Sequence, residues 1–467
     1  MLMNWNLEKL QKITNASKKS QIKKNLKVRG FSIDTRSIQS GELFCALKGK
    51  NHDGHDFLNQ AYKNGASCLL LSNTEKLVPS IPYIKVDNVL DALENIARKT
   101  RKTINAGFIA ITGSVGKTGT KEMIRFALKN VGKTYANKGN FNNHIGVPLS
   151  LSNIPDDTEY CILELGMNQK GEIKKLSNLV SPDIGIITAI ENSHLKGLKT
   201  LENILDAKCE LLENIKRDGC FIYNSDTNYS YKLKKKAESL NITNIISYGK
   251  NANPDIKLLE KIKVKDKNLL KVRYFDREIS WMMPLIAEHW YINFLCILGI
   301  AKYYNLNLNS LLHELESFKL PSGRGNLICI EKWSKKFFII DDSYNSSPAS
   351  LKASLENFNQ IDSRGNKIAI IGDMYELGEK SQKFHLSMKR EIENTNLNII
   401  FTIGKFTKKL NQELSNSIQK YHFDDISDLE KELKKIISTN DILLVKGSNA
   451  VGLNTLVKKI VGDQNDL

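Results

Sequence analysis

The chain has 467 residues, 41% of them hydrophobic and 25% charged, which is the composition of an ordinary folded protein but too much chain for a single hydrophobic core. The formal net charge is +17, yet lysine is spread along the whole chain, and no stripe of basic and aromatic residues marks a nucleic-acid surface. We therefore expect two to four domains and no nucleic-acid partner.

Cysteine usage and the lack of long apolar runs indicate a cytoplasmic protein. Seven cysteines occur, and none belongs to a C-x-x-C pair, so we expect reduced thiols rather than disulfides or a zinc site. The first residues lack the apolar core of a signal peptide. The longest apolar stretch, residues 290–301, carries Asn293 and is shorter than the ~18–20 residues that a membrane span needs.

Strands and helices alternate along the chain in three blocks, residues 1–105, 106–319 and 320–467. The expected strands are 42–47 and 68–71 in the first block, 160–165, 184–189 and 219–224 in the second, and 337–340, 367–371, 399–403 and 442–445 in the third. The alternation predicts an α/β fold with three domains. These are a small mixed N-terminal domain, a central P-loop-type domain with a mostly parallel sheet, and a C-terminal doubly wound Rossmann-like domain. We expect a hinge at Pro321-Ser322-Gly323.

The second block opens with the phosphate-binding pattern GFIAITGSVGKTGTKE at residues 107–122. An apolar strand leads into a glycine-containing turn, whose backbone N–H groups and following helix N-terminus suit phosphates. Lys117 would reach the β- and γ-phosphates, and the Thr118 hydroxyl would bind Mg²⁺. Ile111 stands where the strict P-loop pattern has glycine, so this is a variant P-loop. An ordinary glycine-rich turn between strand and helix is the alternative.

Polar residues follow the other strands of the second block. Glu164 ends a strand, at the edge where α/β sheets bind ligands, and would either hold Mg²⁺ or face solvent. His194 is either a metal or phosphate ligand or an ordinary loop residue. By itself Lys208 would be a lysine on the surface of a helix. Asn293 lies in an apolar helix, where a ligand base or a backbone carbonyl would satisfy its amide.

Strand ends in the third block also carry ligand-type residues. Asp341-Asp342 and Tyr344-Asn345 follow one strand, 372–378 follow a second, and Lys446-Gly447-Ser448 follow a third. Arg324 lies where this block opens. Polar residues at three strand ends of one sheet predict a rim that faces a ligand.

A series of motifs, in this order, resembles the Mur ligase family of bacterial cell-wall synthesis. They are TGSVGKTGTKE, GNFNNHIGVPLSL, ELGMNQKGEI, HLKGL with AKCEL, DDSYNSSPASLKA, GDMYELGEKS with a later His, and VKGS. The likeness runs from about Ser32 to Gly452. Asp34-Thr35-Arg36 and GELFCALKG with DGHDF resemble the UDP-binding domain of the family. The run GDMYELGE favours the member that adds a D-alanyl-D-alanine dipeptide.

The resemblance implies an ATP-dependent amide ligase with a UDP-sugar-binding domain (1–105), a central ATP-binding domain (106–319) and a C-terminal ligase domain (320–467). ATP would phosphorylate the terminal carboxylate of UDP-MurNAc-tripeptide. The amine of D-Ala-D-Ala would then attack this acyl phosphate to give the UDP-MurNAc-pentapeptide of peptidoglycan synthesis. Two Mg²⁺ ions would take part, and we expect a monomer. The residues do not say whether the third residue of the tripeptide is diaminopimelate or lysine.

The roles of family residues carry over to matching positions in this chain. Lys117, Glu164, His194 and Lys208 would be catalytic, with Lys208 carbamylated by CO₂, since a carbamate is the kind of anionic oxygen ligand that Mg²⁺ prefers. The metal ligands would be Thr118, Glu164, His194 and the Lys208 carbamate. ATP would contact Gly113, Ser114, Gly116, Lys117, Thr118, Asn293, Arg324, Asp341, Asp342, Tyr344 and Asn345. The UDP-linked substrate would contact Asp34, Thr35, Arg36, Ala46, Leu47, Gly49, Asn142 and Asn143.

A few positions depart from the family pattern, and two other functions stay open. Val115 and Gly119 stand where Ser and Thr are usual, Ala287-Glu288-His289 replaces Gly-x-His, and Asn449 replaces an Arg. Another amide ligase of the superfamily, such as the enzyme that adds the third stem-peptide residue or folylpolyglutamate synthetase, would share most motifs, although residues 373–378 argue against both. A nucleic-acid-binding P-loop ATPase is the alternative of a different class.

Overall fold

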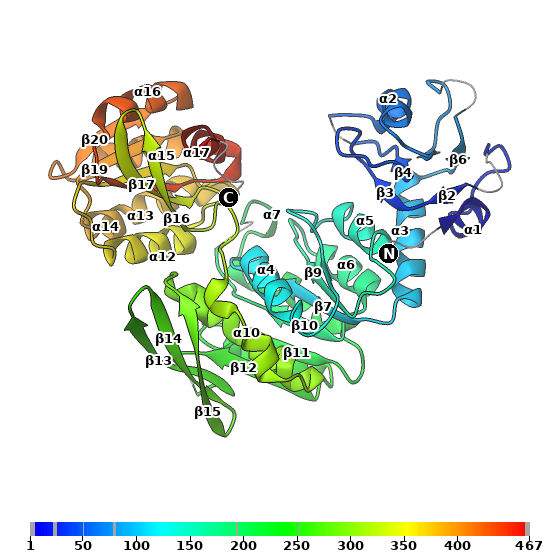
Figure 1. The fold of residues 1–467 in the computed structure, drawn as a ribbon, viewed down its shortest axis with the longest axis horizontal. Coiled ribbons are helices and arrows are strands. Elements are labelled where there is room, and N and C mark those ends of the chain that lie inside the picture. The colour runs from blue at the N-terminus through cyan, green and yellow to red at the C-terminus, as the bar shows by residue number, and fades with distance from the viewer. Residues whose placement is uncertain are drawn as a thin grey trace.

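The computed structural model describes residues 5–21, 26–49, 51–77, 81–192, 195–251 and 253–462, apart from the side chain of Lys196. Strands of these residues form three main sheets that follow one another along the chain, and helices cover them (Figure 1). The predicted α/β fold is therefore confirmed. The boundaries at 105/106 and 319/320 stay predictions.

The N-terminal sheet is short and parallel. Its strands, in spatial order, are β3 (Gly30–Ser32), β4 (Glu42–Cys45), β5 (Cys68–Leu71) and β6 (Tyr83–Lys85). A separate antiparallel pair joins β1 (Trp5–Asn6) to β2 (Lys27–Val28). The helices, with η for a 3-10 helix, are α1 (Leu7–Ile13), η1 (Gly54–Phe57), α2 (Leu58–Lys63) and α3 (Val89–Thr103).

The central sheet has the order β15-β14-β13-β12-β11-β10-β7-β9-β8 and is parallel from β13 to β8. Its strands are β7 (Gly107–Thr112), β8 (Thr134–Ala136), β9 (Tyr160–Glu164), β10 (Ile184–Ile187), β11 (Cys220–Asn224), β12 (Asn244–Gly249), β13 (Ile256–Val264), β14 (Lys267–Tyr274) and β15 (Arg277–Pro284). The antiparallel extension β13-β14-β15 was not predicted.

Helices cover both faces of the central sheet. They are α4 (Lys117–Leu128), α5 (Gly146–Ser152), α6 (Glu172–Val180), α7 (Leu195–Leu198), α8 (Leu201–Cys209), η2 (Leu212–Asn214), α9 (Ser230–Ser239), α10 (Glu288–Tyr304), α11 (Leu308–Leu312) and η3 (Leu315–Ser317). Along β7, Ile109 and Ile111 enter one hydrophobic core, whereas Phe108 and Ala110 enter the other. A strand buried on both faces reads as a continuous apolar run, which is why β7 was predicted from its sequence.

The C-terminal sheet has the order β16-β17-β21-β18-β19-β20, and all of its pairs except β16-β17 are parallel. The strands are β16 (Asn326–Lys332), β17 (Lys335–Asp342), β18 (Lys367–Gly372), β19 (Ile399–Ile403), β20 (Gln419–Phe423) and β21 (Ile442–Lys446). The helices are α12 (Pro348–Asn359), η4 (Gly378–Lys380), α13 (Ser381–Ser387), α14 (Lys389–Glu393), α15 (Lys405–Glu413), α16 (Ile426–Ile436), η5 (Asn449–Val451) and α17 (Leu453–Val461). Two cores flank this sheet, as in a doubly wound domain.

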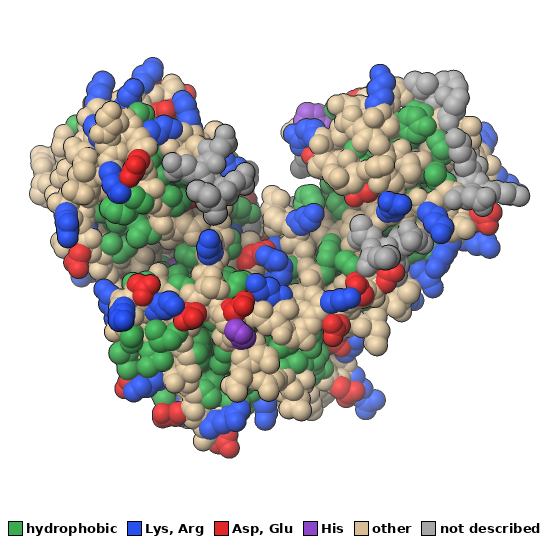
Figure 2. Space-filling view, viewed as in Figure 1, with side chains coloured by type: hydrophobic (Ala, Val, Ile, Leu, Met, Phe, Trp, Pro, Cys, Tyr) green, Lys and Arg blue, Asp and Glu red, His purple; other side chains and the backbone are tan. Residues whose placement is uncertain are grey.

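The N-terminal and central domains share hydrophobic cores, whereas no described residue of another domain enters the cores of the C-terminal domain. Ala97 in the second half of α3 and Ile104 just after this helix belong to a core of the central sheet. In the other direction, Leu149 of α5 belongs to the N-terminal core. The two C-terminal cores consist of residues from β16 onward. Figure 2 shows an open groove between the N-terminal and C-terminal lobes, above the central domain.

We predict that Leu149→Ala destabilises the N-terminal domain from outside its own sheet. Leu149 is 4% exposed, and truncating a buried leucine costs about 2–4 kcal/mol of unfolding free energy. Hydrogen exchange followed by mass spectrometry should show faster exchange in β3 to β6, with little change beyond β16. The exposed Leu259→Ala on β13 is the control. Unchanged exchange in the N-terminal sheet would contradict a shared core.

Candidate active site

The loop between β7 and α4 is bound to the segment that follows β10. Ser114 N donates to Ala189 O at 2.8 Å, and Ser114 Oγ donates to Glu191 O at 2.9 Å. Thr188 Oγ1 donates to Val115 O at 2.6 Å. A Cβ at Gly113, whose φ is +152°, would lie 2.0 Å from Thr188 Oγ1. Glycine is therefore required at position 113, and the loop has the shape of a phosphate cradle at the N-terminus of α4.

Lys117 begins α4 and folds back over this loop. Its Nζ donates to Gly113 O at 2.7 Å and to Ser114 O at 3.2 Å. Desolvation lowers the pKa of Lys117, the charge of Arg324 lowers it further, and Glu164 and Glu376 oppose the shift. Because Arg324 and Glu376 belong to the C-terminal domain, that domain faces the P-loop.

Glu164 is the last residue of β9 and is 2% exposed. Its Oε1 accepts a hydrogen bond from Asn142 Nδ2 at 2.7 Å, whereas Oε2 is buried with no hydrogen-bond partner in the described part of the chain. A buried carboxylate oxygen without a partner is costly in a protein interior unless a ligand satisfies it. The donor set therefore fits a divalent cation, which prefers carboxylate and hydroxyl oxygens.

Lys208 lies on α8 and is buried, with 1% of its surface exposed. Desolvation holds the pKa of Lys208 well below its usual value; Lys117 adds to the shift and Glu164 opposes it. Lys208 is thus an interior group beside the P-loop lysine, rather than the surface lysine that its helix alone would indicate. His194, the other expected metal ligand, lies outside the described residues. Among the described residues, no three His, Cys, Asp or Glu side chains form a group that could hold a metal ion, either around Glu164 or in another part of the fold.

The first two turns of α10 lie against the P-loop and the start of α4. A Cβ at Gly116 would lie 2.8 Å from Asn293 Nδ2, so the Asn293 amide touches the loop where it enters α4. Trp290 fills the space beside Gly119, where a Cβ would lie 2.6 Å from its ring. This contact explains why glycine replaces Thr at position 119. Nearby protein atoms lower the pKa of His289 by displacing water, Lys446 and Arg324 add to the shift, and Asp342 opposes it, while the residue as a whole keeps an exposed surface.

The predicted acidic residues of the C-terminal rim already have protein partners. Asp341 Oδ2 accepts from Gly323 N at 2.9 Å, and its Oδ1 accepts from Ser343 Oγ at 2.6 Å. Asp342 forms an ion pair with the buried Lys446 at 2.7 Å. Lys446 also donates to Asn345 O at 3.1 Å. The structure thus places both aspartates at the end of β17, directly before the turn that carries Tyr344 and Asn345.

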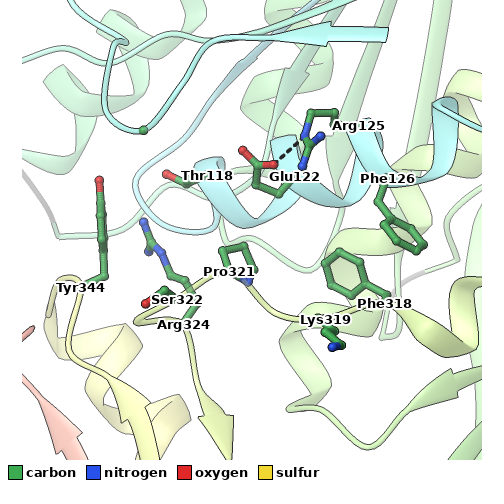
Figure 3. A pocket seen from close by; sticks show the side chains of 11 residues that line it. Thr118, Glu122, Arg125, Phe126, Phe318, Lys319, Pro321, Ser322, Arg324 and Tyr344 are labelled. Carbon is green, nitrogen blue, oxygen red and sulfur yellow. Dashed lines mark hydrogen bonds and ion pairs between the residues drawn. The ribbon is translucent and has the colours of Figure 1, made fainter. Parts of the chain in front are cut away.

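A cavity of about 290 Å³ lies between α4 and the chain that enters the C-terminal domain (Figure 3). Thr118 and Phe126 line it from α4, and Pro321, Arg324 and Tyr344 line it from the other side. The Arg324 guanidinium lies over the Tyr344 ring, with Cζ 3.9 Å from the ring centre. Basic and aromatic groups therefore surround a space that begins at the P-loop threonine.

The expected substrate residues divide into two sets. Asn142 reaches Glu164, as described above, and Asn143 Oδ1 accepts from Gly146 N at 2.9 Å at the start of α5. The other set lies in the N-terminal lobe, away from the P-loop (Figure 1). There Arg36 Nη2 bonds to Asp34 at 2.6 Å, which lowers the pKa of Asp34 to about 2. Thr35 O accepts from Asn64 Nδ2 at 2.8 Å.

The turn with Ala46, Leu47 and Gly49 is closed by two backbone hydrogen bonds. Gly49 N donates to His52 O at 2.9 Å, and Gly54 N donates to Leu47 O at 2.8 Å. A Cβ at Gly54 would lie 2.8 Å from Leu47 N, so the DGHDF motif packs directly on this turn.

Several residues organise the site through hydrogen bonds that the sequence did not predict. Thr188 supports the P-loop, as described above. Asp373 accepts from Thr407 N at 2.8 Å, His385 Nε2 accepts from Met374 N at 2.8 Å, and Ser448 Oγ accepts from Tyr375 N at 2.8 Å. These bonds hold the GDMYELGE loop, in which Glu376 has a φ of +66°. The motif was visible in the sequence, but its internal hydrogen bonds were not.

A P-loop at the carboxyl edge of a parallel sheet, facing the rim of a second α/β domain, defines a three-domain P-loop enzyme. The family model described as "Mur ligase middle domain" matches residues 111–301. Those described as "Mur ligase, glutamate ligase domain" and "Mur ligase family, catalytic domain" match residues 323–449 and 27–101.

Full-length relatives agree with the domain matches. UDP-N-acetylmuramoyl-tripeptide–D-alanyl-D-alanine ligase of Rickettsia prowazekii is 33% identical over 437 residues, which is 94% of this chain and 96% of the relative. MurF from Acinetobacter baumannii superposes with a TM-score of 0.85 at 26% identity, over 98% of this chain and 99% of that one. MurF ligase from Thermotoga maritima in complex with ADP superposes with a TM-score of 0.79 at 26% identity, over 94% of this chain and 98% of that one. The chain belongs to the Mur ligase family and is a ligase, as its motifs predicted.

In the described chain, no helix combines the length and apolarity needed to cross a membrane.

We predict that His385 makes the stability of the protein sensitive to acid. His385 is fully buried, Nδ1 bonds to Ser381 O at 2.7 Å, and burial lowers its pKa. The unfolded chain takes up a proton near pH 6.5 more readily than the folded protein, so this stability is complete above that pH and is lost as the pH falls below it. Unfolding by urea at pH 7.5 and pH 5.5 should show a smaller pH dependence for His385→Gln than for wild type. An equal loss in both proteins would contradict this role.

Proposed function

We propose that the protein joins D-alanyl-D-alanine to UDP-MurNAc-tripeptide, using ATP and an acyl-phosphate intermediate, to make UDP-MurNAc-pentapeptide for peptidoglycan. One observation carries the proposal: Lys117 folds over the P-loop, and Glu164, at the end of the neighbouring strand, has a buried oxygen with no hydrogen-bond partner among the described residues. Lys208 is buried and close enough for its charge to interact with both groups. The full-length similarity to a ligase with this name supports the choice of substrates.

ATP is the nucleotide that we assign to the P-loop and the adjoining cavity. The relative from Thermotoga maritima was solved with ADP, and the stacked Arg324 and Tyr344 suit a nucleotide. Lys117, at present bonded to loop carbonyls, would turn to the phosphates. Asn293 would meet the nucleotide beside Gly116. Asp341, Asp342 and Asn345 would support the rim on which Arg324 and Tyr344 stand.

Thr118, Glu164, His194 and a carbamate on Lys208 would hold Mg²⁺. The metal would neutralise the charge that develops on the transferred phosphoryl group and on the carboxylate. The free carboxylate oxygen of Glu164 is ready for this role. Lys208 suits carbamylation because only a neutral amine reacts with CO₂, and burial favours the neutral form.

The reaction proceeds in two steps at this edge. An oxygen of the tripeptide carboxylate attacks the γ-phosphorus, the bond to the β-phosphate oxygen breaks, and ADP leaves. The dipeptide nitrogen then attacks the acyl carbon, loses a proton, and expels inorganic phosphate as the amide forms. Lys117 and Arg324 stabilise negative charge from opposite sides. Closure of the C-terminal domain about 321–323 would exclude water from the acyl phosphate.

The UDP end of the substrate would lie in the N-terminal lobe. Arg36, Asp34 and Thr35 would contact it together with the 46–49 turn, while Asn142 and Asn143 would line the path to Glu164. We expect the enzyme to act as a monomer in the cytoplasm, without nucleic acid.

The defining test is ligation with purified protein, ATP, Mg²⁺ and UDP-MurNAc-tripeptide that carries either diaminopimelate or lysine. The proposal predicts one product whose mass equals the sum of the tripeptide substrate and D-Ala-D-Ala minus water. Free diaminopimelate, lysine or glutamate should not be joined to shorter UDP-peptides or to a folate. Joining one of those acceptors instead, or phosphate release that only DNA or RNA stimulates, would contradict it.

Lys117→Ala should remove nearly all ligase activity. Loss of a preorganised charge in such a site costs about 3–4 kcal/mol, or roughly 100- to 1,000-fold in rate. Phosphate release under saturating substrates measures the effect. Lys99→Ala, at an exposed position of α3, is the control and should keep wild-type activity. Near-normal turnover by Lys117→Ala would rule out the assigned role.

Lys208→Ala should be almost inactive and should recover part of its activity in millimolar acetate or formate. The small carboxylate would occupy the space of the carbamate and supply its oxygen ligands. Product formation at increasing carboxylate concentration measures this recovery, and Lys117→Ala under the same conditions should show none. Full activity of Lys208→Ala without added carboxylate would refute a carbamate at this position.

A further inference from the structure

The side-chain amide of Asn137 is fully engaged with the backbone around Glu164. Asn137 Oδ1 accepts from Glu164 N at 2.9 Å, and Asn137 Nδ2 donates to Glu164 O at 3.2 Å and to Phe141 O at 2.8 Å. Asn137 is 1% exposed. Since one bond needs an acceptor and two need donors, the backbone itself dictates which end of the amide is oxygen.

These bonds extend the ladder between β8 and β9 by one step. The last paired residue of β8 is Ala136, opposite Ile162, and Asn137 N still reaches Ile162 O at 3.4 Å. Beyond that point the main chain turns away, and the Asn137 side chain takes the place of a strand beside Glu164. On its other side, Glu164 pairs with Ile111 of β7. Both flanks of the residue are therefore held.

A buried lysine attaches the same segment to the helix of the P-loop. Lys121 of α4 is fully buried, and its Nζ donates to Asn137 O at 2.5 Å and contacts Glu122 Oε1 at 3.3 Å. Lys121 lies one turn beyond Lys117 and Thr118. The helix that presents the phosphate-binding groups and the strand that presents Glu164 are thus joined through one asparagine.

Asn137 also sets the loop that carries Asn142. Its bond to Phe141 O lies directly before Asn142, whose amide holds Glu164 Oε1 at 2.7 Å. Asn142 O in turn accepts from Gly166 N at 2.8 Å. Glu164 is consequently fixed at its backbone by Asn137 and at one carboxylate oxygen by Asn142, which leaves Oε2 directed by the two together.

We propose that Asn137, held by Lys121, is a positioning residue that aims the free carboxylate oxygen of Glu164 at the divalent cation accompanying the nucleotide. The inference rests on the proposed function, because it takes Glu164 as a metal ligand. Asn137 is buried, and the role assigned to it acts through Glu164 and loop 137–142.

The chain offers a matched control for this test. Asn153 makes the same pattern of bonds far from the P-loop: its Oδ1 accepts from Phe31 N at 2.9 Å, and its Nδ2 donates to Phe31 O at 2.9 Å and to Leu149 O at 3.0 Å. Asn137→Leu and Asn153→Leu each remove three hydrogen bonds without adding charge. Only the first acts on Glu164.

The experiment measures Mn²⁺ binding to the protein in the presence of ADP and bicarbonate, by the electron paramagnetic resonance signal of free Mn²⁺. Asn137→Leu should weaken Mn²⁺ affinity by about 10- to 100-fold, as loss of groups that orient metal ligands typically does. Asn153→Leu should stay within about twofold of wild type. In ligation assays, the Mg²⁺ concentration for half-maximal rate should rise for Asn137→Leu by a similar factor, while KM for the UDP-linked substrate stays within about twofold.

Asn137→Ser keeps the test valid if the leucine variant fails to fold. The serine hydroxyl can replace one of the three bonds, so this variant should show an intermediate loss of Mn²⁺ affinity. Adding Lys121→Met to Asn137→Leu should weaken binding little further, because both changes loosen the same link.

Wild-type Mn²⁺ affinity in a folded Asn137 variant would overturn the inference. An equal loss of Mn²⁺ affinity in Asn153→Leu would do the same, and so would the absence of Mn²⁺ binding by the wild-type protein with ADP. Failure of the proposed function is a separate result, because it would appear as absent dipeptide ligation by wild-type protein that still binds Mn²⁺ and ADP.

Discussion

Parallel pairing of β8, β9, β7 and β10 brings the carboxyl ends of four strands to one edge of the central sheet, and the chemistry depends on that edge. The P-loop leaves β7, Glu164 ends β9, and Thr188 follows β10 to support the loop. In a parallel sheet such residues meet without a dedicated scaffold, because every strand points the same way. The surrounding hydrogen bonds then orient the groups at this edge: Asn142 and Asn137 hold Glu164, and Thr188 holds the P-loop at Val115.

The distribution of the hydrophobic cores indicates which parts move together. Because α3 and α5 exchange apolar residues between the N-terminal and central domains, the N-terminal lobe, to which we assign the UDP end of the substrate, and the P-loop belong to one unit. The C-terminal domain has its own cores and approaches the P-loop with charged groups, among them Arg324 and Glu376. A domain held by polar contacts can open and close at small cost, which suits an enzyme that must admit substrates and then exclude water.

Much of this arrangement could be predicted from sequence because its signals are local. The P-loop is one continuous run, and β7, β9 and β19 are apolar segments of ordinary strand length. The position of Glu164 follows from its strand end. The burial of Lys208 could not be predicted in this way, because the sequence of its helix is typical of a surface helix. Only the family motif identified Lys208 as a site residue. The antiparallel β13-β14-β15 extension was missed because exposed, lysine-rich residues interrupt its apolar pattern.

Contacts between distant parts of the chain could not be predicted. Asn137 meets Glu164 across 27 positions and Thr188 meets Val115 across 73, and neither residue type signals such a partner. Conversely, Asp341 and Asn143 match ligand positions in the motifs, yet in the structure their oxygens bond to neighbouring backbone or side-chain groups. Gly119 departs from the family pattern because Trp290 occupies the space of a side chain.

The central claim, that a phosphoryl group and a carboxylate meet at this strand edge, is tested most directly by isotope transfer. UDP-MurNAc-tripeptide labelled with ¹⁸O in its terminal carboxylate would be ligated to D-Ala-D-Ala, and the inorganic phosphate analysed by mass spectrometry. An acyl phosphate requires one carboxylate oxygen to leave with each phosphate, so the account predicts one ¹⁸O per phosphate released. Unlabelled phosphate formed together with the amide product would contradict it.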